Sequence, residues 1–453
     1  MVDAAAVPAG TQVRPATESS YSWLVVGLLF VGYCFSAIDA RVLTLMVEPI
    51  QRDLKLTDFE MSLLQGFAFS LLYSVAAIPI GRAVDRAGRR ANLIAWGVAF
   101  WSAMTAACGF ASGFLSLFLA RVGVGVGEAT LSPTAYSLIS DYFERKRRAL
   151  AISFYAIGYP IGGGLALLIG GWLLTKFTKT GGVVLPALGH FEPWQLVFLS
   201  VALPGIPIAL LMATIREPAR RGVAANLGRQ TTLREGYDYI MANRVLYGSL
   251  IGSLALIALL AIGTSLWFPT FLIRTYKMTP GQVGLTYGTV MLVCGTIGTL
   301  TGGWLSGRLM RSGHADANMR IVLWATFLKG APLVAAPLMP TPFLSLAFMA
   351  LGTLIGQASQ GVMLAAIQDV TPNQLRGQVT AIALFFVNLV GAGLGATVIA
   401  SITDFGFGDK SALRYSIAIT GTVTLPIIVA MLMLAIPHYR RAVMGLNDDT
   451  LDD

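Results

Sequence analysis

The chain has 453 residues, of which 55% are hydrophobic and only 12% are charged, and its mean hydropathy is +0.69. This composition excludes an ordinary soluble domain and predicts an all-α protein that crosses the membrane many times. The formal net charge of +9 comes from basic residues scattered over the loops. Because the sequence contains no separate basic domain, nucleic-acid binding is not expected.

Twelve windows of the sequence are long and apolar enough to span a membrane, since a hydrocarbon core of about 30 Å needs about 20 apolar residues. The polar first 20 residues lack the apolar core and the cleavage site of a signal peptide, so we expect the first span to be kept as an anchor. The predicted spans are 21–48, 57–81, 91–112, 113–140, 148–175, 194–214, 246–273, 281–309, 320–338, 342–369, 377–402 and 411–437.

One long polar stretch divides the spans into two groups of six. The predicted parts are a tail at 1–20, an N-terminal half at 21–214, a linker at 215–245 with helical character from residue 232, a C-terminal half at 246–437 and a tail at 438–453. Of the 32 basic residues, 21 lie in the tails, the linker and the loops on their side, and 8 lie in the opposite loops. Both termini are therefore predicted to be cytoplasmic.

Two segments of the N-terminal half reappear in the C-terminal half at a spacing of about 222 to 228 residues. GRAVDRAGRR (81–90) returns weakly as GRLMRSG (307–313), and SDYFERKRRALAI (140–152) returns as QDVTPNQLRGQVTAI (368–382). The corresponding pairs in the second repeat are Asp141 with Asp369 and Arg148 with Arg376. Two six-span halves in parallel repeat are typical of a transporter.

Four ionisable residues lie inside apolar spans, namely Asp39 and Arg41 in the first and Arg121 and Glu128 in the fourth. A charge at the bilayer centre costs about 2.5 to 3.5 kcal/mol, so these side chains are expected to face partners or a water-filled cavity. Arg121 and Glu128 are two helical turns apart and share a face, while Asp39 and Arg121 lie at equal depth and can pair if their spans are neighbours. A buried acid beside an arginine is a candidate proton carrier, and a permanent structural clasp remains the alternative.

Two motifs resemble the major facilitator superfamily. GRAVDRAGRR (81–90) is similar to its loop signature between spans two and three, and LARVGVGVGEA (119–129) resembles its span-four signature of an arginine followed by a glycine ladder. The glycines have two interpretations, because small residues allow either close helix packing or sliding of one helix past another. The resemblance covers the whole chain and implies the fold of that superfamily, with spans 1, 4, 7 and 10 around a central cavity.

Within the superfamily, the chain looks like the Spinster group. The similarity lies in Asp39 followed nine residues on by Glu-Pro-Ile, in RVGVGVGEATLSPTAYSLISDYF and in YAIGYPIGGGLALLIGGWL. Where the group has an arginine directly after the span-one Asp, this chain has Ala40, and Arg41 follows. The most specific part joins the span-four acid to three later residues: Glu128, Ser132, Pro133 and Tyr136.

The resemblance and the charges together predict three sets of functional residues. For proton coupling we expect Asp39, Arg121 and Glu128. For substrate binding we expect a charged side and an apolar side of one cavity: Arg41, Arg121, Glu128, Tyr136, Trp267, Phe268 and Met363. For a cytoplasmic gate the resemblance implies Gly81, Asp85, Arg86, Arg89, Arg90, Asp141, Arg308 and Asp369. The apolar residues are equally compatible with helix packing, the loop arginines with simple membrane topology, and Lys329 in span nine with pairing or snorkelling.

The predicted function is a proton-linked secondary transporter of lysolipid-like amphiphiles. Alternatives are an exporter of drugs or small organic anions, or a lipid-sensing receptor. The three cysteines lie in apolar spans and the three histidines are scattered, so no metal site, disulfide framework or catalytic constellation is predicted. We expect no cofactor beyond the coupling proton and no obligatory protein partner. The brevity of the chain is typical of bacterial members, which predicts a monomer in the bacterial inner membrane.

Overall fold

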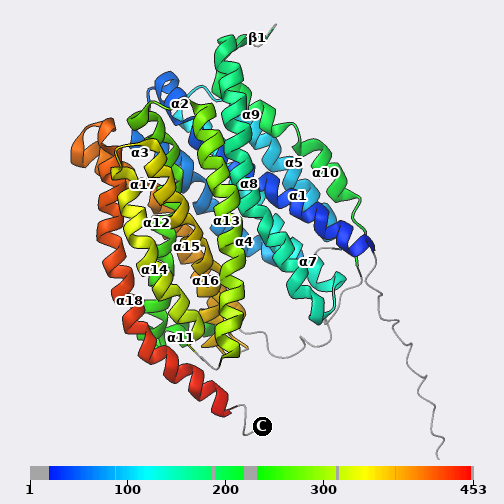
Figure 1. The fold of residues 1–453 in the computed structure, drawn as a ribbon. Helices are drawn as coiled ribbons and strands as arrows, with labels where there is room; N and C mark the ends of the chain where they lie inside the picture. Colours follow the sequence, from blue (N-terminus) through cyan, green and yellow to red (C-terminus); the bar gives the residue numbers. More distant parts are fainter. Residues whose placement is uncertain are drawn as a thin grey trace, which may run out of the picture.

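The computed structural model describes residues 20–86, 88–185, 189–218, 232–312, 316–372 and 374–449, and nearly all of them are helical. Within this part of the chain, twelve helices are long and apolar enough to cross a membrane, which confirms the predicted number. Figure 1 shows two groups of helices side by side, with the N-terminal elements in blue to green and the C-terminal elements in green to red. The tails and linker residues 219–231 lie outside the described residues, apart from Ser20 and the helical C-terminal extension.

The N-terminal half contains ten helices, and several spans are built from two consecutive ones. They are α1 (Ser20–Val42), α2 (Val47–Leu54), α3 (Asp58–Ser62), α4 (Ala68–Arg86), α5 (Arg90–Gly109), α6 (Phe114–Glu128), α7 (Leu131–Tyr142), α8 (Arg145–Thr180), α9 (Pro193–Ala202) and α10 (Gly205–Ala213). A 3₁₀ turn (Leu43–Leu45) extends α1, and a π-helical turn (Leu63–Phe67) joins α3 to α4.

The C-terminal half has longer, less interrupted helices. They are α11 (Leu233–Ala242), α12 (Arg244–Tyr276), α13 (Pro280–Arg311), α14 (Ala317–Ala335), α15 (Pro342–Asp369), α16 (Arg376–Phe386), α17 (Gly395–Ser401) and α18 (Leu413–Asp449). Span eleven is completed by two π-helical segments (Val387–Leu394 and Ile402–Phe407), and short 3₁₀ turns (Ala336–Leu338 and Lys410–Ala412) follow α14 and precede α18.

The ends of the helices agree with local capping signals in the sequence more closely than with the ends of the apolar windows. Thr57 and Thr279 each cap the start of a helix, because their hydroxyls accept a hydrogen bond from the backbone NH of Glu60 or Gln282, three residues on. The side chain of Glu60 or Gln282 in turn accepts a hydrogen bond from the backbone NH of the threonine. The helix predicted from residue 232 is α11. Thr232 caps it, because its hydroxyl accepts a hydrogen bond from the backbone NH of Glu235. Several helices run past the predicted spans because a helix can continue beyond the hydrocarbon, whereas an apolar window ends at the first charges.

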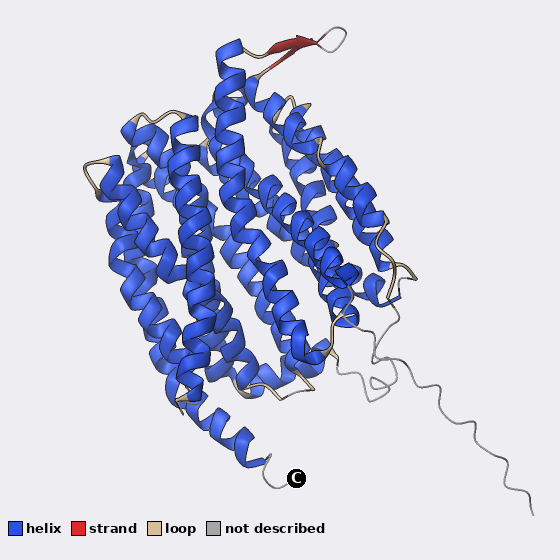
Figure 2. Ribbon diagram, turned by 45° about the vertical axis from the view of Figure 1, so that its right-hand side comes forward, coloured by secondary structure: helices blue, strands red, loops and turns tan. Residues whose placement is uncertain are grey.

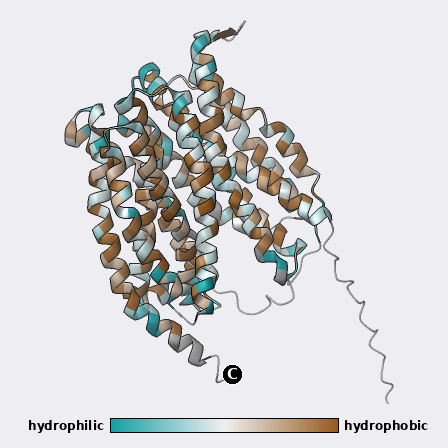
Figure 3. Ribbon diagram, viewed as in Figure 1, coloured by the Kyte–Doolittle hydropathy of each residue, from teal (hydrophilic) through white to brown (hydrophobic). Residues whose placement is uncertain are grey.

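One feature was not predicted: the short strands β1 (Val183–Leu185) and β2 (Gly189–Phe191) form an antiparallel hairpin after α8. Figure 2 shows this hairpin in red at one end of the bundle. We call this end the hairpin end, and the opposite end, where α11 and the start of α8 lie, the linker end. Figure 3 shows predominantly hydrophobic residues along the outer helix surfaces, and Trp96, Leu210 and Phe327 are among the exposed side chains there. These surfaces suit lipid contact.

The two halves pack together through α8 against α13 and through the α4 span against span eleven. Glycines permit this approach: a Cβ on Gly164 would lie 2.6 Å from Cβ of Leu292, and one on Gly284 would lie 2.4 Å from the carbonyl oxygen of Leu167. Likewise, a Cβ on Gly66 would lie 2.3 Å from the carbonyl oxygen of Ala392. No larger side chain fits these positions without moving a helix.

Buried apolar side chains show where the halves join. At the hairpin end a single core contains residues of both halves, such as Val42, Trp194, Trp267 and Ile399. At the linker end the described side chains form two separate cores, one confined to the N-terminal half and one to the C-terminal half. Figure 1 shows the same divergence, with α7 apart from α16 at that end. The halves are therefore held together at the hairpin end.

The predicted repeat reappears in the hydrogen bonding of the linker end. Arg148 Nη2 donates to the carbonyl oxygen of Ser140 at 2.9 Å, and Arg376 Nε donates to that of Gln368 at 3.0 Å. In both halves the arginine at the start of one helix reaches back eight residues, to the last turn of the preceding helix. The equivalent positions therefore make equivalent contacts.

Candidate functional site

Asp39 and Arg121 lie side by side in the interior of the N-terminal half, at 0% and 1% exposure. Arg121 Nη1 donates to the backbone carbonyl of Asp39 at 3.1 Å, and Nε donates to that of Leu64 at 3.5 Å. The Asp39 carboxylate faces the indole of Trp101 and the hydroxyl of Thr105, but neither of its oxygens has a hydrogen-bond partner among the described residues. The structure thus brings Asp39 and Arg121 together through the backbone carbonyl of Asp39, and the Asp39 carboxylate has no hydrogen-bond partner among the described residues.

Glu128 ends α6 about two turns beyond Arg121 and is 4% exposed. Its Oε2 accepts a hydrogen bond from the Ser36 hydroxyl of α1, while Oε1 has no partner in the described part of the chain. Ser36 is about one turn before Asp39 on α1, so Glu128 contacts the helix that carries the other acid. A buried carboxylate with an unsatisfied oxygen is costly when ionised, which makes protonation a favourable way to neutralise it.

The glycine ladder of α6 brings this helix into close contact with its neighbours α4 and α5. A Cβ on Gly125 would lie 2.5 Å from the carbonyl oxygen of Phe69 in α4, and Cβ atoms on Gly123 and Gly127 would collide with Met104 and Trp101 in α5. All three positions are thus in tight helix contact. Phe69 also lies under the guanidinium of Arg121, whose Cζ is 5.8 Å from the ring centroid.

Arg41 connects the two halves rather than lying free in a cavity. Its Nη1 donates to the hydroxyl of Ser265 in α12, and its charge faces Tyr287 of α13. Ser265 is 7% exposed and Tyr287 is 1% exposed. The predicted binding residue therefore lies at the contact between α1 and the C-terminal half, where separation of the halves would release it.

The predicted apolar side of the cavity is packed in this conformation. Trp267 is fully buried and its indole donates to the carbonyl oxygen of Ala396 at 2.9 Å, while Phe268 packs on Tyr287 with ring centroids 5.0 Å apart. Met363 is also fully buried, in the C-terminal linker-end core. Tyr136, in contrast, is 39% exposed.

A cluster at the hairpin end ties the halves together and was not predicted. Arg274, in the last turn of α12, makes a two-pronged contact with Asp58, at 2.6 and 2.7 Å, and donates to Glu48 at 2.6 Å and to Gln51 at 2.9 Å. Asp58 is completely buried. Nearby, the backbone NH of Phe59 donates to Asp404 of span eleven at 2.7 Å. We call Glu48, Gln51, Asp58 and Arg274 the hairpin-end latch.

At the linker end, the predicted gate residues form contacts within each half. Arg90 binds Asp141 at 2.6 Å and Glu217 at 2.5 Å, and it donates to Ser137 at 2.7 Å. Arg89 lies at the N-cap position of α5 without a side-chain capping bond and is exposed, and a Cβ at Gly81 would meet nothing within 4 Å. Asp85 and Arg86 belong to α4, but their side chains lie outside the described residues.

In the C-terminal half, Asp369 is the equivalent of Asp141, but neutral donors take the place of the arginine. Asp369 accepts from Asn318 at 2.7 Å and from Tyr439 at 2.9 Å, and Arg308 lies over the ring of Trp304. Next to them, Asp316 receives hydrogen bonds from Arg320 and Arg440, at 2.7 and 2.6 Å. Partial burial opposes ionisation of Asp316, but the two arginines outweigh it and lower the pKa of this carboxyl.

Comparison with known proteins decides the family. The family model described as Major Facilitator Superfamily matches residues 29–396, which is most of the chain. The chain belongs to the major facilitator superfamily. The predicted twelve-span fold of this superfamily is thereby confirmed.

Among solved structures of superfamily members, the chain is similar to a bacterial homologue of the human lysosomal transporter Spinster in an inward-facing, unoccupied conformation. The TM-score is 0.74 at 26% identity, covering 95% of this chain and 98% of that one. The similarity to the Spinster group that the sequence motifs indicated is therefore also present in the fold.

Sequence relatives include both exporters and Spinster proteins. An "MFS-type efflux pump" of Mycolicibacterium smegmatis is 27% identical over 434 residues, covering 93% of this chain and 94% of its own length. "Protein spinster" of Drosophila melanogaster is 24% identical over 66% of this chain, and "Sphingosine-1-phosphate transporter SPNS2" of Xenopus tropicalis is 26% identical over 63%. The chain spans only about half the length of these two, at 48% and 56%.

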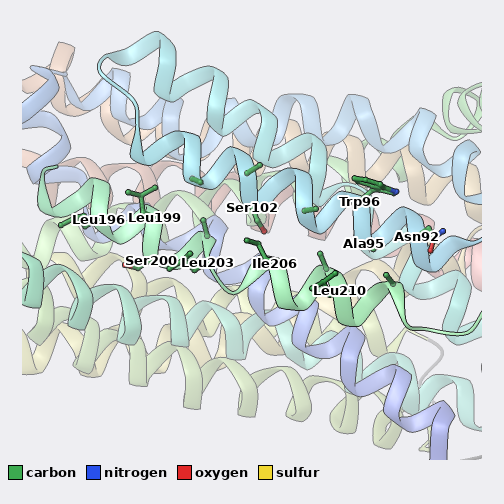
Figure 4. A pocket seen from close by; sticks show the side chains of 16 residues that line it. Asn92, Ala95, Trp96, Ser102, Leu196, Leu199, Ser200, Leu203, Ile206 and Leu210 are labelled. Carbon is green, nitrogen blue, oxygen red and sulfur yellow. The ribbon is translucent and has the colours of Figure 1, made fainter. Parts of the chain in front are cut away.

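A groove on the lipid-facing side of this superfamily member is separate from the buried charges. It has a volume of about 650 Å³ and runs between α5 and the α9–α10 span, where Leu203 and Pro204 interrupt the helix. Figure 4 shows its lining, which is almost entirely apolar and includes Trp96, Leu199 and Ile206. The groove suits a lipid chain and contains none of the predicted site residues.

Proposed function

We propose that this chain is a proton-linked secondary transporter that moves lysolipid-like amphiphiles by alternating access. The observation that carries the proposal is the buried group of Asp39, Arg121 and Glu128, in which both acids keep unsatisfied oxygens. Charges of this kind inside a membrane bundle are typical of proton relays. The glycine-lined contact between the halves and the latch at one end supply the movable parts that alternating access needs.

Several further properties belong to the same proposal. We propose that both termini are cytoplasmic, so that the hairpin end faces outward and the linker-end residues, including Asp85 and Asp141, act as the cytoplasmic gate. The proton is the only coupling species and no cofactor takes part. The protein works as a monomer in a bacterial inner membrane, with membrane lipids around it and no obligatory protein partner, and it carries cargo without changing it chemically.

The test is flux of a fluorescently labelled lysophosphatidylethanolamine into proteoliposomes under an imposed pH gradient. Wild type should give saturable flux that changes with the gradient, whereas Asp39→Asn and Glu128→Gln should make flux independent of it, because an amide keeps the shape but cannot ionise. Asp238→Asn is the control, since this carboxylate is exposed on α11. Flux that keeps its wild-type gradient dependence in both central variants refutes the proton role, and binding without flux would favour a lipid-sensing receptor.

A second candidate function is export of drugs or small organic anions. The observation in its favour is the similarity to the mycobacterial efflux pump over nearly the full length of both proteins. Efflux of ethidium and of a short organic anion, measured in the same vesicles, distinguishes the two functions. Transport of these compounds without transport of the lysolipid would select the exporter.

A further inference from the structure

Tyrosines gather beside Glu128, on the linker side of the buried charges. They come from four helices of the N-terminal half: Tyr33 of α1, Tyr73 of α4, Tyr136 of α7, and Tyr155 and Tyr159 of α8. We call these residues the tyrosine cluster. The proton-coupling argument uses none of them, and Tyr136 is the one member that the sequence analysis predicted as a binding residue.

The rings are held in a defined arrangement. Tyr33 stacks on Tyr155 with centroids 4.6 Å apart and lies 5.4 Å from Tyr159, while Tyr136 meets Tyr155 edge-on at 5.4 Å. Tyr155 is fully buried and its hydroxyl bonds to Ser132 at 3.1 Å, so it anchors the group. Tyr136 and Tyr159 are each 39% exposed. Buried rings thus support rings that remain accessible.

A free carboxylate oxygen lies next to these rings. Tyr73 faces Glu128 as well as Tyr136 and Tyr159, and Glu128 Oε1 has no hydrogen-bond partner in the described structure. The charged groups that face Glu128 are Asp39 from α1 and Arg121 from its own helix. Arg121, however, donates its hydrogen bonds to the backbone carbonyls of Asp39 and Leu64. Glu128 Oε1 is therefore not engaged by a described side chain.

We propose that the tyrosine cluster and Glu128 bind the ammonium group of the cargo, so that the preferred head groups are cationic or zwitterionic rather than purely anionic. Aromatic faces beside a carboxylate are the usual recognition chemistry for organic ammonium ions, because the ring quadrupole and the negative charge act on the same cation. This inference rests on the proposed transport function and names the head group that the site accepts.

The proposal has a consequence for coupling. A cation and a proton cannot both occupy the Glu128 carboxylate, since a protonated acid no longer attracts the ammonium group. Binding of one cargo ion then releases one proton, and the net charge of the site is unchanged. Cargo and protons would accordingly move in opposite directions, which makes the protein an exchanger.

The experiment uses the full chain in lipid nanodiscs and two probes with the same chain length, octyltrimethylammonium and octyl phosphate, with affinity measured by calorimetry. Octyltrimethylammonium should bind more tightly at pH 8 than at pH 6. Tyr136→Leu and Tyr159→Leu should each weaken it about three- to tenfold, whereas Tyr136→Phe and Tyr159→Phe should retain most of the affinity because the ring is kept. Glu128→Gln should weaken it further and remove the pH dependence.

Octyl phosphate and Tyr415→Leu are the controls, since Tyr415 is an exposed tyrosine of α18 in the other half. If octyl phosphate binds better than octyltrimethylammonium, or if the leucine variants weaken both probes equally, the ammonium assignment is overturned. The transport function is judged separately: wild-type lysolipid flux that octyltrimethylammonium fails to inhibit leaves transport intact and refutes only the head-group inference. If a leucine variant misfolds, the phenylalanine variants and the inhibition of lysolipid flux by octyltrimethylammonium still test the head-group proposal.

Discussion

Arg121 is the residue on which the buried charges of the N-terminal half depend. It lies at 1% exposure beside Asp39, and it is the only cation that faces both central acids in the described structure. Removing one member of a buried charge pair is costly because the remaining charge loses its compensation. Among the described residues, the two acids face no second cation that could replace it.

We therefore expect Arg121→Ala to destabilise the protein by about 3 to 5 kcal/mol. The double variant Arg121→Ala with Asp39→Asn should recover part of that loss, since it leaves one stranded acid instead of two. Thermal unfolding of purified protein in detergent measures both. A double variant no more stable than the single one would mean that Asp39 is already neutral in the folded protein.

Asp316 allows a test of electrostatics outside the membrane spans. Its pKa is lowered in the folded protein by Arg320 and Arg440, so its stabilising effect is present above the unfolded pKa of about 3.9 and disappears as the pH falls through the lower folded value. Because both arginines are about half exposed, the effect is small. Asp316→Asn should lower the thermal midpoint by no more than about 2 °C at pH 7, and this difference should shrink as the pH falls below about 3.9. A difference that does not shrink with falling pH would indicate a packing defect.

At the scale of elements, α8 and α13 determine how closely the halves approach. Gly164 and Gly163 are adjacent in α8, but a Cβ on Gly164 meets Leu292 at 2.6 Å, whereas one on Gly163 meets nothing within 4 Å. These two positions form a matched pair, because they share a helix and differ only in the side that they present. One faces the other half and one does not.

We expect Gly164→Leu to prevent close packing of the halves at the hairpin end, while Gly163→Leu should behave like wild type. Accessibility of a cysteine introduced at position 287 to a water-soluble maleimide reports the opening, in a background without the three native cysteines. Labelling should rise in the Gly164 variant alone. Equal labelling in the two variants would show that this helix contact does not control closure.

The number and order of these elements could be predicted from the sequence, and their details could not. Twelve apolar windows give twelve spans because the bilayer requires about 20 apolar residues regardless of tertiary packing. The π-helical segments at 63–67 and 387–394 face each other across the halves, and no local pattern distinguishes them from α-helix. The hairpin at 183–191 joins only three residues per strand, too few for an alternating pattern to be recognised.

At the scale of the whole molecule, the hairpin-end latch is the main polar contact described between the halves. Arg274 should keep that end closed, so Arg274→Gln should shift the population toward opening there. Spin labels at positions 52 and 343, one in each half, should show longer distances by double electron–electron resonance. Arg414→Gln is the control, since Arg414 donates to the carbonyl of Leu338 and lies over the ring of Tyr415, both in its own half. An unchanged distance distribution in the Arg274 variant would rule out a latch function.

The sequence predicted the buried charges of the N-terminal half but not the hairpin-end latch, and the difference has a physical reason. Asp39, Arg121 and Glu128 stand out because charges are expensive inside apolar windows. Arg274 was placed in a loop, one residue past the predicted end of span seven, where a charge is unremarkable. Its partners Glu48 and Asp58 are 226 and 216 residues away, and only the packing of the two halves brings them together. Ser36, the partner of Glu128, is a lone hydroxyl and gives no signal either.

The composition of the latch also determines how the closed end responds to its surroundings. In the closed state the charge of Arg274 lies against both Asp58 and Glu48, and Asp58 is shielded from solvent completely. Opening would place two carboxylates on one rim and a guanidinium on the other, each drawing its own cloud of counterions. Dissolved salt stabilises such separated charges more than the shielded pair. A higher ionic strength on that side of the membrane should therefore raise the fraction of molecules in which the hairpin end is open.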